Sequence, residues 1–158
     1  MQGNPEVIEF LNEQLTGSLT AVHQLMLHGK IQDNRGWTKP AEYTCAEESK
    51  EMKHAEALMV RILLLDGLPN VQRLFHVRTG QTITEMFQAD RQCAVESIDR
   101  LKRGIEVMRG NGDVTSARLF EDILADEEHH CDYTDSQLEL IESLGEPLYL
   151  AQLVEQAG

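Results

Sequence analysis

Two stretches of the sequence decide the fold: Glu51-Met-Lys-His54 and Glu127-Glu-His-His130. Residues three positions apart lie on the same face of an α-helix, so each stretch presents a carboxylate and an imidazole side by side. Two such helices facing each other bring four metal-ligating side chains into one site. The spacing therefore predicts a four-helix bundle with a metal site in its core. A glutamate from each of the other two helices is needed to complete that site.

Composition favours an all-α fold and excludes several classes of partner. The chain has 158 residues, of which 41% are hydrophobic and only 5% aromatic, as expected for one helical domain (residues 1–158) with an aliphatic core. A formal net charge of -13 argues against binding to nucleic acid. The sequence contains no apolar run long enough to span a membrane and no recognisable secretory signal. Three cysteines without a Cys-x-x-Cys spacing favour a reducing, cytoplasmic environment.

Local start and stop signals delimit four long helices. Asn4 is expected to cap a first helix that begins at Pro5 and ends near residues 34–36, and a second helix is expected from Thr38 to Gly67. The capping box formed by Thr82 and Glu85 predicts the start of a third helix, which ends at the glycines of residues 110–112. Asp113 is expected to cap a fourth helix that ends at residue 145, before an amphipathic tail segment over residues 148–156.

The segment between the second and third helices, residues 68–81, is too long for a tight turn. We expect it to cross the length of the bundle, as in ferritin-like folds. Buried side chains are then predicted at helical spacing along each helix. They are Leu11, Leu15, Val22 and Leu25; Glu47, Glu51, His54, Leu58, Ile62 and Leu65; Phe87, Asp90, Ala94, Leu101, Ile105 and Met108; Phe120, Ile123, Glu127, His130, Thr134 and Ile141.

Both Glu-x-x-His stretches lie on these buried faces, where unpaired charges are costly. A metal cation would satisfy all four side chains at once. The alternative is that the four side chains satisfy one another through hydrogen bonds across the core.

The chain resembles a bacterioferritin over essentially its whole length. The matching stretches are Glu51-Met-Lys-His-Ala55, Arg61-Ile-Leu-Leu-Leu-Asp-Gly-Leu-Pro-Asn70, Asp122-Ile-Leu-Ala-Asp-Glu-Glu128 and Tyr149-Leu150. The resemblance implies a four-helix subunit with a short fifth helix, assembled into a hollow cage of about twenty-four subunits that stores ferric mineral. It also implies a di-iron ferroxidase centre in each subunit and a haem b held between two subunits.

The resemblance breaks down at the di-iron centre. Glu51, His54, Glu127 and His130 match the bridging carboxylates and the histidines of that centre. The two terminal glutamates of the family are replaced by Ser18 and Ala94, a tyrosine near the centre is replaced by Leu25, and the ligands of an accessory iron site are replaced by Ala46 and Lys50. Asp90 lies one helical turn from Ala94, but its side chain is short, and Glu96 faces another way. We therefore expect no stable di-iron pair. The four remaining side chains either hold a single iron or zinc ion or only bond to one another.

The haem-binding residue of the family is retained. Met52 matches the methionine that each of two symmetric subunits contributes as an axial ligand of the haem. By the same resemblance, Leu19, Val22, Met26 and Cys45 are expected to line the haem pocket, together with His23, which stands where the family usually has a smaller polar residue. Packing at an interface is the simpler role for an outward methionine. His28, His76 and His129 are interpreted as surface or interface residues.

The leading hypothesis is thus a haem-carrying bacterioferritin subunit without a working ferroxidase centre, which relies in a mixed cage on a ferroxidase-active partner subunit. The family also implies a small ferredoxin as electron donor to the haem. One alternative is an active ferroxidase with a rebuilt site that uses Glu51, His54, Glu127 and His130. The other is a purely structural shell subunit.

Overall fold

The computed structural model describes residues 1–154, which contain five helices and no strand. The helices are α1 (Pro5–Asn34), α2 (Thr38–Leu64), α3 (Ile83–Gly110), α4 (Val114–Leu144) and α5 (Glu146–Ala151). The predicted all-α four-helix bundle, with a long crossover and a short C-terminal fifth helix, is confirmed. None of these helices is both long and apolar enough to cross a membrane.

Side chains cap three of the helices where the sequence predicts them. The Asn4 side chain accepts hydrogen bonds from the backbone at the start of α1, and the Thr82 hydroxyl accepts one from the Glu85 backbone at the start of α3. Asp113 caps α4 by accepting from the Ser116 backbone and hydroxyl, and it also pairs with Arg61 at 2.8 Å. Burial raises the pKa of Asp113, but its bonds to Ser116 and Arg61 outweigh burial, so the pKa is lowered overall.

Two predicted boundaries differ from the structure. Helix α2 ends at Leu64, before the predicted Gly67, because Asp66 adopts a left-handed conformation (φ 60°) and the Gly67 N–H bonds back to the Ile62 carbonyl at 2.9 Å. The predicted tail segment over residues 148–156 corresponds to α5, which already begins at Glu146. Residues 155 and 156 lie outside the described part of the chain.

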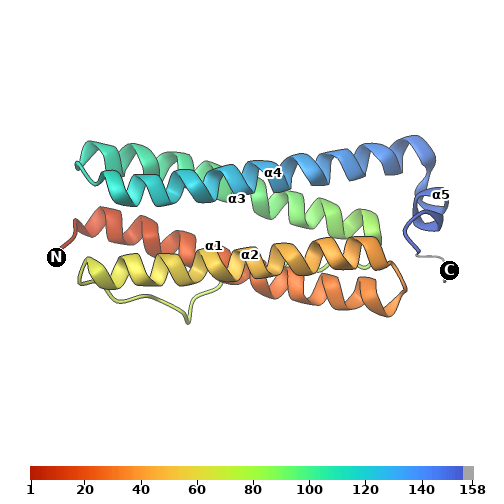
Figure 1. Ribbon diagram of the computed structural model, residues 1–158, viewed down its shortest axis with the longest axis horizontal. Helices are drawn as coiled ribbons and strands as arrows, with labels where there is room; N and C mark the ends of the chain where they lie inside the picture. The colour runs from red at the N-terminus through yellow and green to blue at the C-terminus, as the bar shows by residue number, and fades with distance from the viewer. Residues whose placement is uncertain (155–158) are drawn as a thin grey trace.

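The helices form two antiparallel pairs, α1 with α2 and α3 with α4 (Figure 1). Residues 65–82, called the crossover segment here, run from one end of the bundle to the other, so α2 and α3 point in the same direction (Figure 1). This is the ferritin-like connection. Helix α5 folds across the end of the bundle at which α3 begins (Figure 1).

A row of polar side chains on α1 holds the crossover segment in place. They recur at every fourth residue, and each is buried. An α-helix rises about 6 Å over four residues, and the bonded residues of the crossover segment advance by two or three positions at each step, which an incompletely extended chain covers in the same length. The helix and the segment therefore stay in register. The bonds join Asn12 to the Leu68 carbonyl and the Asn70 N–H, Thr16 to the Arg73 side chain, Thr20 to the Phe75 N–H, Gln24 to the Arg78 N–H and His28 to the Gly80 N–H.

The core follows the predicted buried faces, and every predicted position is buried except Ile105, which is half-buried. A large aliphatic cluster around Leu11, Leu58 and Phe120 fills one half of the bundle. A second cluster, which includes Phe87, Ile141 and Tyr149, joins α5 to α3 and α4. The candidate metal ligands lie between these two clusters along the bundle axis.

Candidate metal centre

The two Glu-x-x-His pairs face each other across the bundle, one on α2 and the other on α4. Glu51, His54, Glu127 and His130 are all buried, as predicted from their helical faces. Ligand atoms of Glu51, His54 and Glu127 lie within 4.8 Å of one another, close enough to bind one cation. The fourth side chain, His130, lies outside this group of three, although it lines a small cavity together with Glu51 and Glu127.

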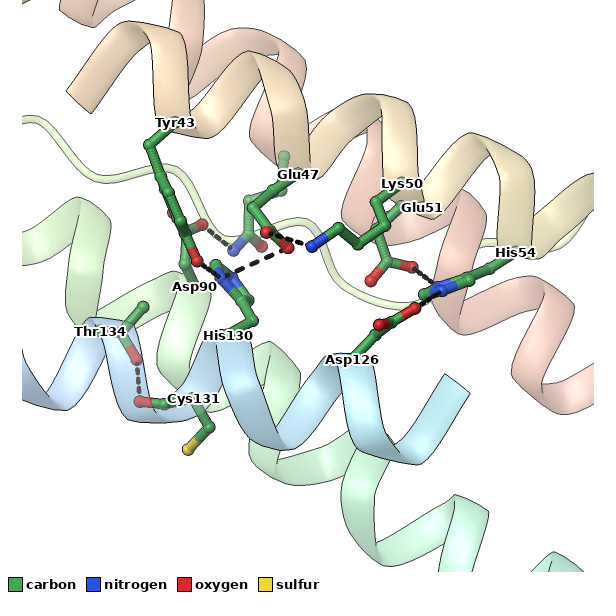
Figure 2. A network of polar contacts seen from close by, with 11 residues as sticks. Tyr43, Glu47, Lys50, Glu51, His54, Asp90, Asp126, His130, Cys131 and Thr134 are labelled. Atoms are coloured by element: carbon green, nitrogen blue, oxygen red, sulfur yellow. Dashed lines mark hydrogen bonds and ion pairs between the residues drawn. The ribbon is translucent and has the colours of Figure 1, made fainter. Parts of the chain in front are cut away.

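The two ring nitrogens of His54 have different surroundings. Its Nε2 bonds to Asp126 Oδ2 at 2.7 Å, which fixes the orientation of the ring (Figure 2). Its Nδ1 is buried without a hydrogen-bond partner among the described residues and lies 3.6 Å from Glu51 Oε2. A ring held by an outer carboxylate, with its other nitrogen facing a buried glutamate, is the usual arrangement of a metal-binding histidine. The donor set therefore fits a first-row divalent cation.

The pKa values of the two buried glutamates are both raised. Burial raises the pKa of both carboxyl groups, and the neighbouring Glu51 raises the pKa of Glu127 further, well above its usual range. The Ser18 hydroxyl acts in the opposite direction from burial and lowers the pKa of Glu51. A divalent cation between the two carboxylates would favour their ionised forms.

The Nδ1 atom of His130 contacts Tyr43 and Glu47. Its Nδ1 is hydrogen bonded to the Tyr43 hydroxyl at 2.8 Å and lies 3.7 Å from Glu47 Oε2 (Figure 2). Glu47 in turn pairs with Lys50 at 3.1 Å. Burial, together with the nearby Glu47, raises the pKa of Tyr43, so the phenol keeps its proton. Tyr43 also stacks on Tyr133, with ring centroids 3.5 Å apart.

Ser18 and Ala94, the positions that match the family's terminal glutamates, are part of the buried wall. Ser18 is 0% exposed and Ala94 is 2% exposed, and Ala94 lines a cavity of ≈ 10 Å³ beside Glu51 and Glu127. That volume holds about one water molecule.

Asp90 also lines this cavity, but its Oδ1 already accepts two hydrogen bonds. One comes from Gln24 Nε2 at 2.8 Å and the other from His28 Nδ1 at 2.9 Å. The interpretation of His28 as a surface or interface residue is therefore wrong. His28 is fully buried because both of its ring nitrogens find partners inside the bundle, Asp90 on one side and the Gly80 N–H on the other. His76 and His129 are exposed.

Four of the candidate haem residues, His23, Met26, Cys45 and Met52, are exposed on the outer side of α1 and α2. Met52 is 41% exposed and Met26 is 44% exposed. Met26 and Cys45 line a surface groove of ≈ 450 Å³ between the two helices. Leu19 is half-buried and Val22 is buried, whereas His23 is exposed and bonds to the Leu19 carbonyl of its own helix at 2.8 Å.

A crossover four-helix bundle with two facing Glu-x-x-His pairs defines a ferritin-like protein, and the family model described as "Ferritin-like domain" matches residues 8–144. The chain is 69% identical to the bacterioferritin of Streptomyces coelicolor over 99% of its own length and 93% of that protein. It is 57% identical to the bacterioferritin of Mycolicibacterium paratuberculosis, over 99% and 98% of the two chains. The chain belongs to the bacterioferritin family of iron-storage proteins.

Solved structures agree with this assignment. The structure of a mycobacterial bacterioferritin, 57% identical in sequence, superposes with a TM-score of 0.96 over 98% of this chain and 96% of that chain. A bacterioferritin of Mycobacterium tuberculosis, 54% identical, gives the same TM-score over 98% of both chains.

The sequence reasoning missed two residues of the site. Tyr43 lies one helical turn before Glu47 and two before Glu51, so extending the buried face of α2 by one turn would have found it. Asp126 precedes Glu127 directly and projects from another side of α4. No spacing signal links Asp126 to His54, because the two side chains meet only once the helices pack.

Proposed function

We propose that this chain is a haem-carrying shell subunit of a bacterioferritin cage of about twenty-four subunits, and that its buried metal site is not a working di-iron ferroxidase. One observation carries the proposal: Ser18 and Ala94, buried beside Glu51 and Glu127, provide no carboxylate where a second iron ion needs one.

Charge balance explains why a site without these two carboxylates would not hold a second iron ion. Two ferrous ions need several hard oxygen ligands and enough negative charge to balance them. The described residues supply Glu51 and Glu127, while Asp90 is held by Gln24 and His28. One cation is balanced by the two glutamates, and a second is not.

Met52 supports the haem part of the proposal. A partly exposed thioether on the outer face of α2 can meet the same residue of a second copy across a two-fold axis. Val60, Leu63 and Leu64 are also exposed on α2, as expected for a helix that another copy covers. Soft thioether ligands suit a haem b, which would supply electron transfer for reductive release of stored iron. The pocket would include Leu19, Val22, His23, Met26 and Cys45.

Oxidation of ferrous iron would then fall to a partner subunit with a complete site in a mixed, cytoplasmic cage, with a small ferredoxin as electron donor. Two other roles remain as outcomes of the test. In one the chain is an active ferroxidase that rebuilds its site around Glu51, His54, Glu127 and His130, and in the other it is a purely structural shell subunit.

The test compares the homomeric cage with two double variants. Ser18→Glu with Ala94→Glu restores both carboxylates, and Ser18→Gln with Ala94→Gln adds the same bulk without charge. We expect ferrous oxidation, followed by stopped-flow absorbance, to be fast only in the glutamate variant. Wild-type rates equal to those of the glutamate variant would contradict the proposal and favour the rebuilt ferroxidase.

The haem and the partner need separate measurements. We expect a Soret band in the native cage that is lost in Met52→Ala, and intact mass spectrometry of that cage should reveal a second kind of subunit. A cage that forms but takes up no haem would favour the structural shell. A native cage with a single kind of subunit would contradict the division of labour.

A further inference from the structure

The two Glu-x-x-His pairs have the same spacing but opposite hydrogen-bonding states. In the first pair, His54 bonds outward to Asp126 through Nε2, and its buried Nδ1 has no hydrogen-bond partner within residues 1–154. In the second pair, the nitrogen at the same ring position is occupied, because His130 Nδ1 and the Tyr43 hydroxyl are bonded at 2.8 Å (Figure 2). Only one of the two imidazoles is free to bind a metal.

We propose that Tyr43 withholds His130 from the buried site, so that the site takes a single divalent cation through Glu51, His54 and Glu127. The inference rests on the proposed loss of the di-iron centre. It identifies Tyr43 as the residue that decides which side chains bind the cation at the remaining site. A nitrogen binds a metal through a free lone pair. His130 Nδ1 has none in either tautomer, because it either accepts the phenol proton or carries its own and donates it to the phenol oxygen.

Several contacts fix Tyr43 in this position. Its ring stacks on Tyr133 at an interplanar angle of 16°, and Tyr133 in turn packs edge-on against Phe87. Glu47 Oε2 lies 3.7 Å from His130 Nδ1, the nitrogen that is bonded to Tyr43, and Glu47 is itself paired with Lys50. A carboxylate so close to His130 favours a ring that stays with Tyr43 and Glu47 over one that turns toward the cation.

The remaining site has two carboxylates and one oriented imidazole, with its other coordination positions open to water. This donor set suits Zn²⁺ or Fe²⁺ and leaves a bound ion with no second metal to share electrons with. Such a site would join α2 to α4 and hold an ion in place.

Zinc binding to the apo cage tests the proposal. Zinc is added at less than one equivalent per subunit to favour the tightest site, and X-ray absorption at the zinc edge counts the imidazole ligands. We expect one imidazole in the wild type and two in Tyr43→Phe, which frees His130 and tightens zinc binding about tenfold. The double variant Tyr43→Phe with His130→Ala should return both readouts to those of the wild type. Tyr133→Phe, which keeps the stacked ring, should match the wild type throughout.

The outcomes separate this inference from the proposed function. Two imidazoles in the wild type, or an unchanged Tyr43→Phe variant, would overturn the role of Tyr43 and leave the loss of ferroxidase activity intact. A wild-type cage that binds two ions per subunit at the buried site would instead contradict the proposed function itself. A gain in affinity that persists in the double variant would also overturn the role of Tyr43, because it would not depend on His130.

Discussion

Replacing Asp126 by Asn tests whether the orientation of His54 matters for metal binding. Asn keeps the shape of the side chain but removes the charge that holds Nε2 at 2.7 Å. Losing an outer carboxylate typically weakens metal binding 10–100-fold. Asp126 is 45% exposed, so water screens its charge, and we expect the lower end of this range. The predicted loss is about tenfold in zinc affinity, or about 1.4 kcal/mol.

The assay is a zinc titration of the apo cage against a chromophoric chelator. The matched control is Asp122→Asn, one helical turn earlier on α4, where the carboxylate is exposed and has no side-chain partner within the described residues. Both variants remove one negative charge from the same helix, but only Asp126→Asn disturbs the His54 ring. Equal losses in the two variants would refute the reasoning, because they would show a general charge effect. No loss in either variant would refute it as well.

Three further predictions concern stability. Gly104→Ala should lower the melting temperature, because a Cβ there would lie 2.4 Å from the Phe120 ring, at a cost of about 1–3 kcal/mol. Gly110→Ala should raise the melting temperature by the equivalent of about 0.4–1 kcal/mol, because a Cβ there meets no neighbour within 4 Å among the described residues. A stabilised Gly104→Ala variant would contradict the packing around Phe120. Phe120→Ala should lower the free energy of unfolding in urea by about 3–5 kcal/mol, since this ring is fully buried. Asp113→Ala should cost about 1–2 kcal/mol at neutral pH through loss of the cap. Because the pKa of Asp113 is lowered on folding, the wild-type advantage should be complete above the ordinary aspartate pKa of about 3.9 and disappear as the pH falls through the folded-state value. An advantage that persists in strong acid would contradict that assignment.

The parts of the fold that depend on local chemistry could be predicted from the sequence. Asn4, Thr82 and Asp113 cap helices through atoms two or three residues away, so a short window of sequence contains the whole signal. The two Glu-x-x-His stretches lie on buried faces for the same reason, since helical spacing decides which residues share a side.

The parts that depend on pairing between distant segments could not be predicted. His28 looks like a surface residue because its partners, Asp90 and the Gly80 backbone, are more than fifty residues away. The same limit applies to His130, whose role depends on Tyr43, 87 residues earlier in the chain. The end of α2 was misplaced because the left-handed turn falls on Asp66, one residue before the glycine that signals it.

The polar row on α1 has a consequence for a chain that is cut. The crossover segment is attached to α1 once per helical turn, from Asn12 at one end to His28 at the other. A protease that cleaved between residues 70 and 73 would leave Asn70 bonded to Asn12 and Arg73 bonded to Thr16. Each of the two fragments would keep its own hydrogen bonds to α1, so a nicked subunit would hold its shape without an intact backbone.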